Sequence, residues 1–384
     1  QDLRVFETWL TPQNLVSARL LGVADVTRVE RGLPAPTVPR QHHHGKPRAA
    51  PLAAPDASVN QPLVTVQYDP TAAGHIADNR LLQTATLSKL LAAGKTDVPA
   101  FPVTAVALKP TYVTATRSNL VDGRYFRLEV WPGPPAQPQS FGPSQWKQWV
   151  WVDVNDPGPG PGTGKVDPIG TPQSRTPQTT YGLGRFVYRR MSAADAETDN
   201  AVRTAVLGKR AGVAIAGDYR LLVAMHVTSR EITRWTWQTF WWTPAPDAPP
   251  APSSAAVAKD RPAELRDAPR NYAMAIGYDM LSPATPTTGG GDNGVPILVY
   301  NPWLEAEFVP SNLPDSKPWT FQGKKYDNKF GIQTNCMSCH EQANFGSNPN
   351  PPNYTADQYI DLNGPQFKGF LKVDFLWSIP DNAK

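Results

Sequence analysis

The chain has 384 residues, with 42 Pro, 28 Gly, 12 Trp and only 2 Cys, and its formal net charge is +4. Pro at this density interrupts helices every few residues and excludes a long helical bundle, while an aromatic content of 10% excludes wholesale disorder. Two cysteines cannot frame a disulfide-rich scaffold. The composition predicts a mainly β fold, sandwich-like or barrel-like, with long Pro-rich loops and few short helices.

Charge and hydropathy exclude two further classes of protein. Basic side chains do not cluster on any one segment, so we expect no nucleic-acid partner. No apolar run approaches the roughly 20 residues that cross a bilayer, so we expect no membrane span. The chain begins at Gln1 rather than Met, which we interpret as the removal of an export leader. Nothing in the sequence indicates an oligomeric state.

Residues 1–60 form the first predicted unit, an N-terminal extended and Pro-rich segment. The leucines between residues 10 and 21 fit a short helix. Residues 31–60 are rich in Pro, Ala and basic side chains, and sequence of this kind is typically extended at the surface.

Residues 61–300 form a predicted β-rich domain. Alternating apolar and polar residues, bounded by Pro, Gly, Asn or Asp, indicate strands over 63–68, 101–108, 111–116, 125–131, 146–154, 219–229 and 232–243. We expect the last two to pair. Ser192 and Asp195 form a capping-box pattern that predicts a helix running to Gly208. Pro- and Gly-rich stretches near 156–177 and 243–270 are predicted linkers or exposed loops.

Residues 301–384 form the third predicted unit, an irregular C-terminal segment packed on the β domain. Both cysteines lie here, in the sequence Cys336-Met337-Ser338-Cys339-His340, which has the pattern C-x-x-C-H. Two thiols three positions apart lie on one side of a turn, so each can bond a different vinyl group on one porphyrin edge. The adjacent histidine can then supply a nitrogen to the iron.

In these five residues the chain resembles the c-type cytochromes. The resemblance implies one covalent haem c, with Cys336 and Cys339 as thioether anchors and His340 as the proximal iron ligand. Haem c is attached outside the cytoplasm, so the resemblance also implies export, and we expect the periplasm of a Gram-negative bacterium. Trp377, in the same C-terminal unit, is a candidate for contact with the porphyrin.

Other interpretations of the motif are a thioredoxin-type redox pair, a lone disulfide and half of a zinc site. A redox pair belongs to a βα turn, and a zinc site needs further ligands, usually more cysteines. The chain has no other cysteine, which favours haem, because stray thiols interfere with haem attachment in an oxidising compartment.

The sixth position on the iron has no obvious occupant. The 44 residues after His340 contain neither Met nor His, so a distal ligand must come from upstream, from Lys or Tyr, from water, or be absent. Ordinary core packing is an alternative role for every upstream candidate. The candidates are His226, Met225, Met280 and Met274.

Two functions follow from these observations. The first is single-electron transfer to a redox partner protein, by a six-coordinate iron. The second is a haem enzyme with an open distal site, such as a peroxidase, an oxygenase or an oxidase of small nitrogen compounds. The enzyme would need a distal acid or base, for which His226, Arg234 and Glu231 are candidates, although no spacing identifies a catalytic group.

Two dense groups of tryptophans could form the wall of a binding pocket or fill a β core. We expect the core role, because aromatic cross-strand pairs are common in packed sheets. The residues are Trp146, Trp149, Trp151, Trp235, Trp237, Trp241 and Trp242.

Overall fold

The computed structural model describes residues 4–20, 42–43, 46–47, 60, 62–207, 213–282, 295–313, 319–321, 324–326, 329–346 and 361–384. Most of the predicted N-terminal segment 1–60 therefore lies outside the described residues. Within the described ranges the chain is mainly β with few short helices, which confirms the predicted fold class. The division into three units at residues 60 and 300 stays a prediction.

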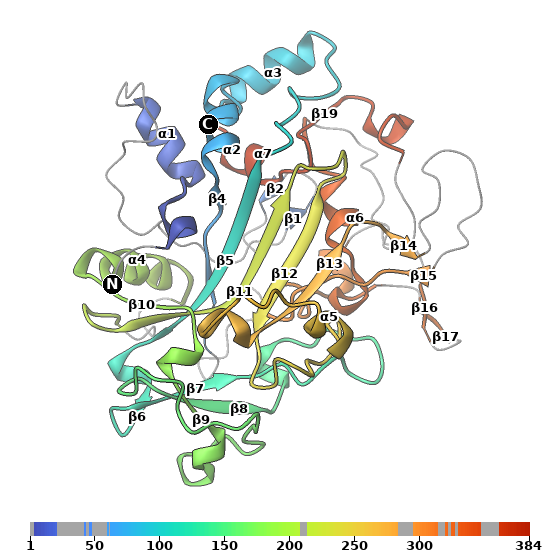
Figure 1. The fold of residues 1–384 in the computed structure, drawn as a ribbon. Coiled ribbons are helices and arrows are strands. Elements are labelled where there is room, and N and C mark those ends of the chain that lie inside the picture. The colour runs from blue at the N-terminus through green and yellow to red at the C-terminus, as the bar shows by residue number, and fades with distance from the viewer. Residues whose placement is uncertain are drawn as a thin grey trace.

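The largest element is an antiparallel sheet of seven strands, with the order β13-β12-β11-β5-β3 and with β4 and β10 pairing onto β5 and β11 (Figure 1). The pairing of β11 with β12 confirms the hairpin predicted from residues 219–243. The strands are β3 (Leu63–Val64), β4 (Gln67–Tyr68), β5 (Val106–Ala115), β10 (Tyr188–Arg190), β11 (Tyr219–Ser229), β12 (Thr236–Trp242) and β13 (Tyr272–Gly277).

A second sheet of four strands has the order β6-β7-β8-β9, and its last pair is parallel. In Figure 1 it lies below the long strands, and both sheets contribute to one hydrophobic core. Tryptophans supply much of this core, as predicted, because Trp146, Trp151, Trp241 and Trp242 are all buried. The strands are β6 (Leu120–Val121), β7 (Tyr125–Glu129), β8 (Trp149–Asp153) and β9 (Thr180–Gly182).

A second hydrophobic core lies at the opposite end of the long strands, where α2, α3 and the C-terminal residues gather (Figure 1). The helix predicted after Ser192 is confirmed as α4. The helices are α1 (Pro12–Leu20), α2 (Pro70–Asp78), α3 (Thr84–Ala92), α4 (Ala193–Leu207), α5 (Ala255–Lys259), α6 (Cys336–His340) and α7 (Ser378–Asn382). Four short ladders complete the described strands: β1 (His42–His43) with β2 (Lys46–Pro47), β14 (Leu281–Ser282) with β15 (Val295–Pro296), β16 (Trp319–Phe321) with β17 (Lys324–Tyr326), and β18 (Asn344–Gly346) with β19 (Phe370–Lys372).

Pro110 explains a wrong strand prediction. The stretches 101–108 and 111–116 were expected to be separate strands, yet β5 runs unbroken through Pro110. The neighbouring strand is interrupted instead, into β3 and β4, and between them the Thr65 N–H donates to the Pro110 carbonyl. A proline lacks an N–H but keeps its carbonyl, so a break in the partner strand accommodates it within a sheet.

None of the helices in the described ranges is long and apolar enough to span a bilayer.

Candidate functional site

The C-x-x-C-H residues form the short helix α6, and the residue before them explains its start. The Asn335 side chain caps the helix by accepting a hydrogen bond from the Met337 N–H at 2.9 Å. The same side chain is fully buried and donates to the Ile297 carbonyl at 2.8 Å. Cys336 adds a second hydrogen bond to the same segment, because its N–H donates to the carbonyl of Val299. The motif is therefore fixed to the segment 297–299 by the Asn335 side chain and by the backbone N–H of Cys336.

Cys336, Cys339 and His340 line one cavity. One face of the large sheet also lines it, through Ala107 and Lys109 of β5, His226 and Thr228 of β11, and Trp237 of β12. Cys336 packs against both hydrophobic cores, so the motif lies where the two cores meet. Trp377 also lines the cavity, and its indole N–H donates to the Cys339 carbonyl at 3.0 Å.

A hydrogen bond and a ring contact help to fix the imidazole of His340. Its Nδ1 lies 2.7 Å from the Phe375 carbonyl oxygen. A carbonyl only accepts, so Nδ1 carries the hydrogen, and in the neutral imidazole Nε2 then carries the lone pair that a metal ligand needs. The Trp237 ring lies against the imidazole, with 4.2 Å between the ring centroids. Of the seven tryptophans in the two dense groups, Trp237 therefore forms part of the cavity wall as well as part of a hydrophobic core.

Neither thiol is in a disulfide, and both are half-buried in the lining of the cavity. Burial raises the pKa of Cys339 to about 12, and the nearby Glu305 carboxylate adds to the shift. The pKa of Cys336 is raised well above its ordinary value by the same two causes. Both cysteines are therefore neutral thiols at neutral pH, unlike the thiolate of a reactive redox pair.

His226 faces the same cavity and is paired with Glu305. The His226 Nε2 and the Glu305 Oε1 lie 2.9 Å apart, and each side chain is 18% exposed. Glu305 also accepts from the Asn301 N–H, and Asn301 is tied to β12 through Thr239. Burial alone would raise the pKa of Glu305, but the charges of His226 and Lys109 outweigh it and hold that pKa below its usual range. The other imidazole nitrogen of His226, Nδ1, is buried without a hydrogen-bond partner among the described residues.

The three methionines proposed as distal ligands lie away from the cavity lining. Met225 and Met274 both pair with Phe240 across the sheet, one position out of step with His226, so they face the opposite side. Met280 is fully buried in the second hydrophobic core. The structure therefore brings His226, and not these methionines, together with the motif.

The other candidate acid–base residues also lie outside the cavity lining. Arg234 forms an ion pair with Glu341, and Glu231 is exposed and accepts from Ser229.

Two groups at the site were missed by sequence reasoning. Glu305 is 79 positions from His226, and the Phe375 carbonyl is 35 positions from His340. A backbone carbonyl has no signature in a sequence, and Glu305 belongs to no pattern. Only the Asn at position 335 gave a local signal, as a good helix N-cap.

Within the described ranges, no group of three or more His, Cys, Asp or Glu side chains is arranged to hold a metal ion directly. Comparisons with protein-family models, with curated proteins and with solved structures find no match to this chain.

Proposed function

We propose that this chain is an exported, monohaem c-type cytochrome that transfers single electrons to a partner protein. The observation that carries the proposal is the convergence of Cys336, Cys339 and His340 on one turn of helix at one cavity. Two thiols and an imidazole at this spacing are the protein groups that haem c requires. Because haem c is attached outside the cytoplasm, the proposal includes the periplasm as the location.

The residues at the cavity fit such a group. Cys336 and Cys339 would hold it through thioether bonds, and His340 would ligate its iron. A haem bound there would supply a one-electron iron couple. The chain contributes a fixed His340 tautomer, the Trp237 ring against that imidazole, and a wall of apolar side chains that limits access of water. One protein nitrogen is sufficient on the proximal side, since a porphyrin brings four nitrogens of its own.

His226 is the distal ligand that the electron-transfer proposal favours, because it alone of the four candidates lines the cavity. Residues 300–384 carry 7 basic and 9 acidic side chains, and this acidic balance suits a basic partner.

A second candidate function is a haem enzyme with an open distal site, and the His226–Glu305 pair favours it. A histidine held by a carboxylate and left with an unpartnered nitrogen is suited to move a proton to or from a small ligand. The two functions assign His226 different roles, as an iron ligand or as an acid–base group.

The test of haem attachment is production of the chain together with a haem c maturation system, followed by denaturation and a haem assay. We expect haem to stay with the unfolded chain at one per molecule. Cys336→Ala combined with Cys339→Ala should abolish covalent haem, whereas Ser338→Ala, between the two thiols, should retain it. Covalent haem in the double cysteine variant, or none in the wild type, would refute the proposal.

The optical spectrum separates the two functions. Electron transfer predicts low-spin ferric iron in the wild type and a change to high spin in His226→Ala. An open site predicts high-spin iron in both proteins, with binding of CO or peroxide, and slower peroxide reaction in His226→Ala. Low-spin iron that is unchanged in His226→Ala would refute His226 as the ligand.

A further inference from the structure

Two turns that contain residues with strained backbone dihedrals meet next to His340. Among the non-glycine residues with positive φ are Trp235 at 58°, Asp374 at 46° and Phe375 at 68°. Asp tolerates this left-handed region, but Trp and Phe rarely adopt it, so their backbone here is strained. Strain of this kind persists only where surrounding contacts hold it. The contacts here converge on a single side chain, the carboxylate of Asp374.

Asp374 accepts three hydrogen bonds from two separate parts of the fold. Its Oδ2 accepts from the Phe101 N–H at 2.8 Å, in the segment before β5. The same oxygen accepts from the Arg230 Nε at 3.2 Å, and Oδ1 accepts from the Trp235 indole at 3.1 Å. Arg230 and Trp235 flank the turn that joins β11 to β12. The side chain of Asp374 is only 11% exposed, so these bonds are largely protected from water.

The turn that Asp374 anchors presents the carbonyl of Phe375. The Leu376 N–H donates to the Val373 carbonyl at 3.1 Å and closes the turn, with Asp374 and Phe375 as its two central residues. The Phe375 carbonyl then accepts from His340 Nδ1 at 2.7 Å. Asp374 does not touch His340, so its influence passes through the shape of this turn.

We propose that Asp374 is a positioning residue that holds the strained 373–376 turn against the β11–β12 turn, so that the Phe375 carbonyl fixes His340 with its hydrogen on Nδ1. This inference rests on the proposed role of His340 as an iron ligand. A strong hydrogen bond to the outer nitrogen raises the basicity of a ligating histidine and stabilises the oxidised metal. Asp374 therefore contributes to a low reduction potential.

The experiment compares the wild type with Asp374→Ala and Asp374→Asn in two measurements. Nitrogen NMR of the His340 imidazole in the haem-free chain reports which nitrogen carries the hydrogen. Potentiometry of the covalently loaded protein reports the reduction potential. We expect Asp374→Ala to populate the second tautomer and to change the redox equilibrium about tenfold toward the reduced state, about 59 mV for one electron. Asp374→Asn, which keeps one acceptor oxygen and the same size, should shift both in the same direction by less.

Asp97→Ala is the matched control, because Asp97 pairs with Lys372 on the same C-terminal segment and is 56% exposed. It should leave both measurements at wild-type values. If Asp374→Ala does not fold, Asp374→Asn decides the question alone. A wild-type tautomer and potential in the folded Asp374→Asn protein would overturn the inference. Failure of haem attachment would refute the proposed function and still leave the tautomer measurement to test Asp374.

Discussion

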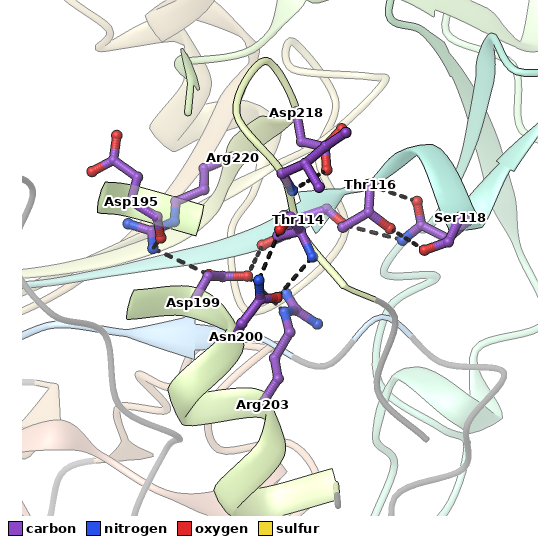
Figure 2. A network of polar contacts seen from close by, with 12 residues as sticks. Thr114, Thr116, Ser118, Asp195, Asp199, Asn200, Arg203, Asp218 and Arg220 are labelled. Atoms are coloured by element: carbon purple, nitrogen blue, oxygen red, sulfur yellow. Dashed lines mark hydrogen bonds and ion pairs between the residues drawn. The ribbon is translucent and has the colours of Figure 1, made fainter. Parts of the chain in front are cut away.

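The strand β11 carries a charged or ionisable side chain near each end, and the two have opposite surroundings. Near its start Arg220 lies 3.1 Å from Asp199, and the side chains are 5% and 0% exposed. Figure 2 shows α4 bringing Asp199 and Arg203 to this place, beside Thr114 of β5. Near the end of the strand His226 faces the cavity, with Glu305 as its partner. We call these the closed end and the open end of β11.

The comparison distinguishes a charged pair that stabilises the fold, at the closed end, from a pair that can take part in chemistry, at the open end. At the closed end Asp199 contacts Arg203, Thr114 and Arg220, and it is not among the residues that line the cavity beside the C-x-x-C-H motif. A fully enclosed ion pair of this kind specifies how α4 sits on the sheet. At the open end the side chains line a cavity, and the His226 Nδ1 has no hydrogen-bond partner among the described residues, which leaves this end able to meet a ligand.

The largest expected effect is at the closed end. Asp199→Asn keeps the size of the side chain but leaves Arg220 buried without its counter-charge. Removing one partner of a buried ion pair costs about 3–5 kcal/mol, so we expect a loss of that size in the free energy of unfolding. Denaturant titration measures it, through a lower midpoint at unchanged slope. Glu197→Gln, on the exposed side of α4, is the control and should change stability by less than about 0.5 kcal/mol.

Glu129 on β7 sharpens the comparison, because it is a buried carboxyl whose hydrogen-bond donor is an amide rather than a cation. It is 3% exposed and accepts from the Asn60 side chain at 2.8 Å. Burial raises its pKa to about 7, and the hydrogen bonds of Asn60 only partly oppose the shift. Between its ordinary pKa and pH 7 the folded chain therefore holds a proton that the unfolded chain has released. Stability falls as the pH rises through this window, by about 3 kcal/mol at most.

Glu129→Gln should remove that pH dependence. We expect the variant to exceed the wild type in stability at pH 8 by up to about 3 kcal/mol, and to equal it below the ordinary pKa of a glutamate. Urea titrations at several pH values measure the stability difference between variant and wild type in both pH ranges. Glu231→Gln, at an exposed position, should follow the wild-type curve. A wild-type stability that rises between pH 5 and pH 8, by an amount that Glu129→Gln abolishes, would contradict the assignment.

The predictable parts of the fold are those governed by local pattern. The hairpin of β11 and β12 follows from two runs of β-branched and aromatic residues, and α4 from a capping box followed by a stretch without Pro or Gly. Pro110 misled because its effect on β5 depends on where the neighbouring strand breaks, which is a tertiary fact. α2 was missed although Asp69 and Pro70 form an N-cap and N1 pair, since Gly74 and the polar residues around it obscured the helical period.

The candidate site divides in the same way. Cys336, Cys339 and His340 are found from the sequence because their chemistry depends on spacing within one turn. Among four distal candidates, sequence could not prefer His226 to Met225, since both lie on one strand and only the packing decides which face meets the cavity. The Asp374 turn could not be predicted, because its conformation is imposed by Arg230, Trp235 and Phe101 from distant segments.

The smallest expected effect is at the open end. Glu305→Gln matches the change made at Asp199, but its partner His226 is part of a cavity wall and both side chains are 18% exposed. The low pKa of Glu305 means that its carboxylate, in contact with His226, stabilises the fold above the ordinary glutamate pKa, and this stabilisation is lost as the pH falls through the lowered pKa. We expect the variant to lose about 1 kcal/mol at pH 7 and to approach the wild type in acid, in urea titrations at equal haem content. A loss at pH 7 as large as that of Asp199→Asn would show that the open end is as structural as the closed one, and that His226 is held for the fold rather than for a ligand.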